Sequence, residues 1–255
     1  MKLYYYFHFG DCVLKVPHNI SRFSRTRVRK NTPHSQFVFD HREDLICELS
    51  CVKDLAQSFS FTSYLEMMAG LGFSAKLVNS IQDLNEIWLN DKDEFCTTSL
   101  AINFANEVGK EIMITQSDVL DLKVVGRWDV IFIDFSTFSM KRWNEWLRLW
   151  GNVKGKFRNL WLTDTACYVW TKFGAQTFEK CFGFKSLEQY CQSFSNLIKS
   201  TLGASLRRAR IGANGKCAIL DFEYGYEGGW DLRKVDKSLG LKIEVKWGLR
   251  NGCEK

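Results

Sequence analysis

A pair of glycines at the end of an apolar run is the first feature of this sequence with the chemistry of a ligand site. Gly70 and Gly72 follow a run that begins at Tyr64, and the residues from Ser74 onward have helical spacing. Glycine lets a backbone approach a ligand closely, and the free amides at a helix N-terminus favour a carboxylate or phosphate. This order predicts a strand, a ligand loop and a helix, although an ordinary structural turn has the same pattern.

Acidic residues follow the next two predicted strands. Asp91 ends the second strand, roughly twenty residues after the glycines, where a carboxylate can accept both hydroxyls of a ribose. Asp118 follows the third strand, where a carboxylate can accept a hydrogen bond from an adenine amino group. A surface turn is the alternative interpretation of Asp118. The order and spacing together favour an adenosine-containing cofactor.

The fourth predicted strand ends at a third carboxylate. It delivers Asp134 and Phe135 to the carboxyl edge of the sheet, where ligands of open α/β folds bind. In amino-methylating enzymes this position holds the group that accepts a hydrogen bond from the target amine, and a carboxylate oxygen there can align the nitrogen lone pair with the sulfonium methyl group of the cofactor. This chemistry needs no strong base, because much of the barrier concerns orientation. A helix N-cap, with Ser136 as a competing cap, is the alternative role of Asp134.

The histidine and cysteine patterns exclude other kinds of site. All four histidines lie within the first 41 residues, so the rest of the chain offers no Ser-His-Asp or Cys-His centre and few transition-metal ligands. The nine cysteines show no paired CxxC spacing, which indicates free thiols in a reducing compartment and predicts a cytoplasmic protein. From these two patterns we expect no metal site. No stretch of 18 apolar residues occurs, so we expect no membrane segment.

These side chains need elements that bring them to one edge. Short apolar runs alternate with helical patterns from Tyr64 onward, which is typical of a parallel sheet with helices on both faces. The predicted strands cover residues 63–68, 86–90, 111–115, 129–134 and 158–163, and the predicted helices cover 74–81, 95–107, 140–150 and 187–201. Strands over 207–211 and 217–223 with a glycine-rich turn between them predict a hairpin, and 241–247 is a last strand candidate.

The fold class that follows is α/β. We expect a Rossmann-like class I methyltransferase fold, with a mostly parallel seven-stranded sheet, a C-terminal antiparallel hairpin and helices on both faces. Residues 1–60 are expected to form an N-terminal basic and aromatic arm with a lead-in segment. Residues 61–255 are expected to form the methyltransferase domain.

Basic residues gather in two places in a chain with a net charge of +6. The first run contains no acidic residue and consists of Arg22, Arg25, Arg27, Arg29 and Lys30; the second consists of Arg207, Arg208 and Arg210. Both predict contacts with RNA phosphates. A solvated surface is the alternative interpretation of each run.

A series of short motifs appears in a fixed order along residues 36–175. The motifs are Val38-Phe39-Asp40-His41-Arg42-Glu43-Asp44-Leu45, Met68-Ala69-Gly70-Leu71-Gly72, Leu89-Asn90-Asp91 followed by Asn103 and Asn106, Asp134-Phe135, Leu162-Thr163-Asp164-Thr165-Ala166 and Lys172-Phe173-Gly174-Ala175. Their order resembles that of the tRNA guanine-N2 methyltransferases, which dimethylate a guanine in the tRNA body.

The resemblance implies an enzyme that transfers a methyl group from S-adenosylmethionine to the exocyclic amino group of an RNA base. The residues that would bind the cofactor are Arg42, Glu66, Ala69, Gly70, Gly72, Asp91, Asp118 and Val119. Asp134 and Phe135 would contact the target base, which must be flipped out of its stack to be reached. The implied partner is a tRNA-like RNA, and a protein partner is also compatible with the large aromatic content.

The sequence also departs from the family pattern. No proline follows Asp134, His41 replaces an asparagine before Arg42, and only about eighty residues follow Ala175, without the family's large tRNA-binding domain. A chain of this build would suit a viral or mobile-element relative. The departures leave open a catalytically inactive methyltransferase-like subunit that binds RNA or protein, and an enzyme that methylates DNA or a protein. An NAD-dependent dehydrogenase fits less well, because Ala75 occupies the position of the third glycine.

Overall fold

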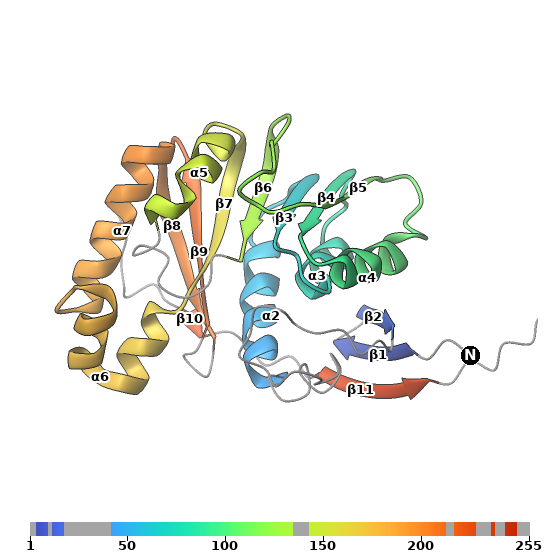
Figure 1. Ribbon diagram of the computed structural model, residues 1–255, viewed down its shortest axis with the longest axis horizontal. Helices are drawn as coiled ribbons and strands as arrows, with labels where there is room; N and C mark the ends of the chain where they lie inside the picture. The colour runs from blue at the N-terminus through green and yellow to red at the C-terminus, as the bar shows by residue number, and fades with distance from the viewer. Residues whose placement is uncertain are drawn as a thin grey trace, which may run out of the picture.

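The computed structural model describes residues 4–9, 12–17, 42–134, 143–212, 217–227, 236–237 and 243–248 (Figure 1). Its main sheet has the strand order β10-β8-β9-β7-β6-β3-β4-β5. The strands are β3 (Ser63–Met67), β4 (Glu86–Asp91), β5 (Glu111–Gln116), β6 (Trp128–Ile133), β7 (Phe157–Asp164), β8 (Ala204–Ile211), β9 (Ala218–Tyr224) and the short edge strand β10 (Asp236–Lys237).

This sheet confirms the predicted fold class. Strands β3 to β7 are parallel, and β9 lies antiparallel between β7 and β8. Strands β8 and β9 form the predicted hairpin, with the register shift of an irregularity between Leu206 and Arg208. The result is a seven-stranded, mostly parallel sheet that closes with an antiparallel hairpin and carries β10 as an extra edge strand.

The order of the strands creates a switch point at the centre of the sheet. From β3 the chain adds β4 and β5 on one side, and it then returns across β3 to add β6 and β7 on the other side. The strands that follow β3 and β6 along the chain, β4 and β7, therefore lie on opposite sides of this central pair. Ligands of doubly wound folds bind at the carboxyl edge of such a switch point.

Helices cover both faces of the main sheet (Figure 1). One face carries α2 (Arg42–Ala56), α3 (Phe73–Ile81) and α4 (Glu94–Phe104). The other face carries the short 3₁₀ helix η1 (Trp143–Trp146), α5 (Leu147–Val153), α6 (Ala166–Phe182) and α7 (Leu187–Leu202). Each face buries its own apolar cluster, so both layers are held by the hydrophobic effect.

The helix predictions agree with the structure to different degrees. The helices predicted over 74–81 and 187–201 match α3 and α7 closely, whereas the one predicted over 95–107 ends earlier, at Phe104. The helix predicted over 140–150 begins as 3₁₀ at Trp143 in the described chain and continues as α5 to Val153. Trp143 of η1 stacks on Trp150 of α5, with ring centroids 4.5 Å apart, so the two helices pack against each other.

A second, three-stranded sheet lies beside α3 and α4. It consists of β1 (Tyr4–Phe9), β2 (Cys12–Pro17) and β11 (Ile243–Gly248) in the order β11-β1-β2, with antiparallel pairing throughout. The strand predicted over 241–247 is therefore present, but it pairs with β1 and not with the main sheet. Phe7 and Phe9 are fully buried and pack against Phe73 of α3, so the small sheet shares a core with the main domain.

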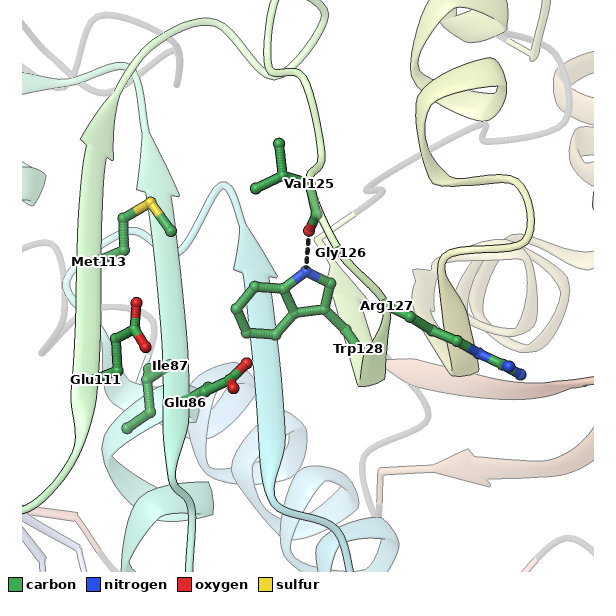
Figure 2. Close-up of a pocket in the computed structure, with 8 residues that line it drawn as sticks. All are labelled: Glu86, Ile87, Glu111, Met113, Val125, Gly126, Arg127 and Trp128. Atoms are coloured by element: carbon green, nitrogen blue, oxygen red, sulfur yellow. Dashed lines mark hydrogen bonds between the residues drawn. The ribbon is translucent and has the colours of Figure 1, made fainter.

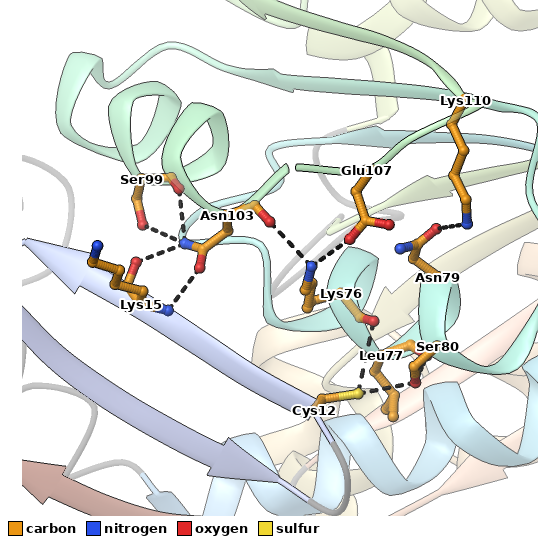
Figure 3. Close-up of polar contacts among 10 residues, drawn as sticks. All are labelled: Cys12, Lys15, Lys76, Leu77, Asn79, Ser80, Ser99, Asn103, Glu107 and Lys110. Carbon is orange, nitrogen blue, oxygen red and sulfur yellow. Dashed lines mark hydrogen bonds and ion pairs between the residues drawn. The ribbon is translucent and has the colours of Figure 1, made fainter. Parts of the chain in front are cut away.

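Polar contacts fasten this small sheet to the helices (Figure 3). The Asn103 side chain accepts a hydrogen bond from the backbone amide of Lys15 at 2.6 Å and donates one to the Lys15 carbonyl at 2.7 Å. An amide side chain thus takes the place of a neighbouring strand along β2. The thiol of Cys12, on β2, donates a hydrogen bond to the Ser80 hydroxyl of α3 at 2.9 Å. The Lys76 ammonium, also on α3, pairs with Glu107.

Candidate functional site

The glycine loop follows β3 at the switch point, and its two glycines have different roles. Gly72 has a φ of 88°, and a Cβ atom there would lie 2.5 Å from Leu100 Cδ2, so helix packing requires a glycine. Gly70 has a φ of 55°, and a Cβ atom there would meet nothing within 4 Å. The backbone of Gly70 therefore faces open space, as a ligand loop requires. Met68 also has a positive φ of 61°, which is rare for a residue with a side chain.

Asp91 is held in place by the glycine loop. Its Oδ2 accepts a hydrogen bond from the Gly70 amide at 2.9 Å, and its Oδ1 accepts one from the Asp93 amide at 2.9 Å. The Ala69 amide donates to the carbonyl of Asn90 in the same turn. A carboxylate oxygen has two lone pairs and can accept more than one hydrogen bond. The structure thus brings together Ala69, Gly70 and Asp91, three of the residues predicted to bind the cofactor.

Asp134 occupies the carboxyl end of β6 on the other side of the switch point. The Thr163 hydroxyl of β7 donates a hydrogen bond to Asp134 Oδ1 at 2.7 Å and fixes the carboxyl group. Burial raises the pKa of Asp134 above its usual range, the Thr163 hydrogen bond opposes the rise, and the charge of Asp91 adds to it. Phe135, the other residue predicted to contact the target, lies outside the described residues.

Glu66 supplies a further carboxyl group beneath the loop. It is only 3% exposed, and the Tyr64 hydroxyl donates a hydrogen bond to its Oε2 at 2.8 Å. Burial raises the pKa of Glu66 to about 8, against the lowering effect of the Tyr64 hydrogen bond and with further rises from Asp134 and Asp91. At neutral pH this carboxyl group is therefore mainly protonated.

Glu48 is a residue of the site that sequence reasoning missed. It lies on α2 and accepts a hydrogen bond from Ser74, the second residue of α3. Burial raises its pKa well above the usual range, and the neighbouring charges of Asp134 and Glu66 raise it further. Glu48 belongs to no motif, and only the packing of α2 against α3 brings it to the loop, so no sequence signal marked it.

We call Glu48, Glu66, Asp91 and Asp134 the carboxylate cluster. In the part of the chain that the structure describes, no lysine or arginine forms an ion pair with Glu48, Glu66 or Asp134. Buried acids that repel one another hold protons or attract a cation. The cluster therefore has the electrostatics of a site for a positively charged or hydrogen-bond-donating ligand.

Asp118 and Val119 follow β5 at the same edge of the sheet. Asp118 Oδ1 accepts a hydrogen bond from the Leu120 amide at 3.1 Å, and its Oδ2 lies 3.5 Å from the Lys92 ammonium. The side chains of both members of this ion pair are about two-fifths exposed. Val119 is buried in the core. Asp118 thus makes a local turn contact, and it lies at the carboxyl edge of the sheet, the same edge as Asp91 and Asp134.

The predicted phosphate-binding residues fall into two groups. The run over 22–30 lies outside the described residues. Arg42, predicted to bind the cofactor and not phosphate, is the first residue of α2, and its side chain also lies outside them. Arg207 pairs with the buried Asp221 at 2.9 Å and lies over the ring of Phe59, with only 14% of its side chain exposed. Arg210 lies 4.0 Å from Asp54 and is equally buried. These two guanidinium groups are engaged by acids of the same chain.

Arg208 lies between these two arginines on β8. Its pKa is lowered by partial burial first and by the charge of Arg207 next.

The described residues contain no group of three or more histidine, cysteine or acidic side chains placed to hold a metal ion. Among the same residues, no helix has the length and apolar content needed to span a membrane.

The strand order, the glycine loop and the acidic strand ends define a Rossmann-like methyltransferase fold, and solved structures agree. The pyocyanin biosynthetic protein PhzM superposes with a TM-score of 0.54 and 13% identity, over 78% of this chain and 60% of PhzM. The mitomycin 7-O-methyltransferase MmcR gives 0.52 and 13%, over 75% of this chain and 58% of MmcR. Magnesium protoporphyrin IX methyltransferase ChlM from Synechocystis PCC 6803, solved with bound SAH, gives 0.51 and 12%, over 73% and 87%.

Identities this low show the fold alone. The chain spans only about three-fifths of PhzM and MmcR, so their activities and substrates do not transfer to it. No protein-family model matches the sequence, and no curated protein does. The chain therefore has a class I methyltransferase fold, and its chemistry must be argued from its own site.

Proposed function

We propose that this protein is an S-adenosylmethionine-dependent methyltransferase that acts on an amino group. The observation that carries the proposal is the carboxylate cluster around an open glycine loop at the switch point of the sheet. The glycine loop alone is a common feature. Together with Asp91 fixed at the end of the neighbouring strand, it forms a cradle for an adenosine-containing ligand.

The residues present fit this cofactor. Gly70 leaves room for a ligand against its backbone, and Asp91 places a carboxylate, the group that accepts ribose hydroxyls, directly beside that loop. In the proposed arrangement Glu66, Ala69 and Gly72 shape the loop, Asp118 and Val119 border the adenine, and Arg42 contacts the cofactor from the start of α2. Bound S-adenosylmethionine supplies an electrophilic methyl group on a cationic sulfur. The charge of Asp91, which acts on Glu66 and Asp134, is opposite in sign to this sulfur.

Asp134 then has the position of an acceptor for the group to be methylated. Its Oδ1 is occupied by the Thr163 hydroxyl, which leaves Oδ2 to accept a hydrogen bond from a target N–H. Holding that N–H fixes the nitrogen lone pair towards the methyl group, and orientation of this kind supplies much of the rate enhancement of a transfer. A cluster rich in acids repels an anionic acceptor such as a phenolate and favours an amine.

The substrate we propose is the exocyclic amino group of an RNA base, of the tRNA guanine-N2 kind, in the cytoplasm. Phe135 would stack on the flipped base, and the basic run over 22–30 would contact phosphates. Because Arg207 and Arg210 are paired with acids, Arg208 is the member of the second basic cluster with the greater capacity for a phosphate. DNA bases are the alternative acceptors for the same chemistry.

A second candidate is a binding subunit that has kept the fold without catalysis. It is favoured by the sequence Phe135-Ser136 after Asp134, where the resembling family has a proline. This candidate can retain the cofactor cradle, so a binding measurement alone does not distinguish it. Methyl transfer does.

The test has two stages. In the first, calorimetric titration with S-adenosylmethionine compares the wild-type protein with Asp91→Ala, and with Asp83→Ala as an exposed control in the loop before β4. We expect micromolar binding by the wild type and the control. We expect a loss of tenfold or more in Asp91→Ala, because charged hydrogen bonds contribute about 1.5–3 kcal/mol each. Absence of binding by the wild type would exclude the proposed function.

In the second stage, a labelled methyl donor is offered with tRNA transcripts, single-stranded DNA and duplex DNA, and the products are digested to nucleosides. We expect label in a methylated guanosine from tRNA, reduced at least a hundredfold in Asp134→Ala and less in Asp134→Asn, which keeps an acceptor oxygen. Label in DNA alone would assign the alternative acceptor. Cofactor binding without transfer to any of these acceptors would favour the binding subunit.

A further inference from the structure

A pocket of about 220 Å³ opens at the amino edge of the main sheet, the edge opposite to the carboxylate cluster (Figure 2). It lies where β4, β5 and β6 begin. Its lining consists of Glu86, Ile87, Glu111, Met113, Val125, Gly126, Arg127 and Trp128. Nothing in the proposed methyl transfer uses this edge.

Two carboxylates stand side by side at the mouth of the pocket. Glu86 and Glu111 are register partners on the parallel strands β4 and β5, so their backbones are separated by one strand spacing of about 4.8 Å. Both side chains are exposed, and in the described part of the chain neither forms an ion pair. Like charges in directly opposite positions destabilise a sheet. The fold thus tolerates an unneutralised acid pair at this point.

Three basic residues at this edge of the sheet contact other groups. The Arg127 guanidinium points away from the pocket in Figure 2 and lies 6.0 Å from the ring centroid of Tyr224. Lys110 precedes Glu111 in the chain, but its ammonium donates to Asn79 Oδ1 at 2.7 Å. The Lys156 ammonium donates to the Val124 carbonyl. These three cations therefore contact groups other than Glu86 and Glu111, which leaves the charge of the acid pair available to an incoming group.

The wall of the pocket is aromatic and apolar. The indole of Trp128 is fixed by a hydrogen bond from its Nε1 to the Val125 carbonyl at 3.0 Å, and the Met113 side chain lies across the pocket from it in Figure 2. Large apolar side chains continue along the same edge of the sheet, where Val125 is 59%, Tyr224 44% and Tyr226 39% exposed. Exposed aromatic and apolar residues around a specific pocket are typical of a protein interface.

We propose that this edge is a docking surface for a partner protein, which inserts an arginine side chain between Glu86 and Glu111 against the Trp128 indole. A guanidinium is planar, so it can bind two carboxylates through separate N–H groups and contact an aromatic ring. Val125 and Tyr224 would contact apolar residues that flank the arginine. The acid pair repels nucleic acid, so this surface complements a nucleic-acid site on the opposite edge. The inference does not depend on the proposed methyl transfer.

Methionine methyl groups provide a direct test, because the two edges carry separate reporters. Met113 lines the pocket, whereas Met67 and Met68 lie beside the carboxylate cluster at the end of β3 and the start of the loop. The protein is labelled with ¹³C in its methionine methyl groups, and Met113→Leu assigns the pocket signal. The probes are the acetylated tripeptide amide leucine-arginine-leucine and its counterpart with citrulline, the neutral isostere of arginine.

We expect the arginine peptide to shift the Met113 signal saturably and to leave the Met67 signal in place. We expect the citrulline peptide, and the Glu86→Gln/Glu111→Gln variant with the arginine peptide, to bind at least tenfold more weakly. Equal binding of the two peptides would overturn the inference, because the acid pair would then contribute nothing. A Met113 shift with single-stranded oligonucleotide would overturn the choice of a protein partner, and the absence of any Met113 shift would overturn the docking surface itself.

A thermal denaturation curve shows whether the double variant is folded, so that a loss of binding can be assigned to the missing charges. Removing two like charges from opposite positions should leave the melting temperature unchanged or raise it slightly. Titration of the same labelled sample with S-adenosylmethionine should shift Met68 and not Met113. Failure of that titration would count against the proposed function and would leave the result for the amino edge intact.

Discussion

The stability of this protein should fall as the pH rises from 5 to 8, and Glu66 should cause much of the fall. The ordinary glutamate pKa of 4.5 applies to the unfolded chain, whereas burial raises the pKa of Glu66 in the fold to about 8. Below pH 4.5 the carboxyl group is protonated in both states and costs nothing. Between the two pKa values the unfolded state loses its proton first, so the free energy of unfolding decreases as the pH rises.

The size of the effect follows from the two pKa values. Compared with a neutral side chain at the same position, Glu66 lowers the free energy of unfolding by about 1.4 kcal/mol at pH 5.5 and by about 4.6 kcal/mol at pH 8.5, at about 1.36 kcal/mol per pKa unit. Glu66→Gln should therefore be more stable than the wild type, by about 3 kcal/mol more at pH 8.5 than at pH 5.5. The amide oxygen of glutamine can still accept the Tyr64 hydrogen bond, so the comparison isolates the charge.

Urea unfolding followed by circular dichroism at pH 5.5, 7.0 and 8.5 measures this difference. Glu179→Gln, at an exposed position on α6, is the matched control and should show the same stability difference from the wild type at every pH. A constant difference between Glu66→Gln and the wild type across the three pH values would refute the reasoning. It would mean that the carboxyl group ionises in the fold as easily as in water.

Three further substitutions test the packing described above. Gly72→Ala should lower the free energy of unfolding by about 2–4 kcal/mol, because the added Cβ meets Leu100 and the backbone at position 72 has a positive φ. Chemical denaturation measures this loss, and an unchanged free energy of unfolding would show that α4 can shift. Asn103→Ala should cost about 1–3 kcal/mol and speed amide hydrogen exchange in β2, whereas unchanged exchange would mean that apolar packing alone holds the hairpin. Asp221→Ala should cost about 3–5 kcal/mol by leaving Arg207 without its buried partner, and a loss below 1 kcal/mol in denaturant would contradict that pairing.

The sequence was sufficient for the parts of the fold that depend on local pattern. Apolar runs of strand length alternated with amphipathic helices, and short connections place such elements beside one another, so the main sheet and its hairpin could be predicted. The positions of Gly70, Asp91 and Asp134 also followed, because parallel strands end at one edge. Each of these inferences needs only neighbours in the chain and the rules of parallel sheets.

The features that escaped prediction depend on contacts between distant segments. Glu48 reaches the site only because α2 packs on α3, and no spacing in the sequence encodes that packing. Helix α6 was missed because Gly174, with a φ of 74° and a ψ of 175°, interrupts it in the middle and breaks its helical pattern. The amino-edge pocket depends on the register of Glu86 with Glu111, which appears only once β4 and β5 are paired.

The pairing of β1 with β11 joins the first and the last described strands of the chain in one sheet. Tyr4 and Gly248 are register partners, so the first and last described strands lie one strand spacing apart. During synthesis β1 leaves the ribosome long before β11 exists, so one edge of β1 stays unpaired until β11 has been made. Closure of the small sheet is therefore a late event in folding. A chain interrupted anywhere before Ile243 would leave one edge of β1 unpaired and available for association with another molecule.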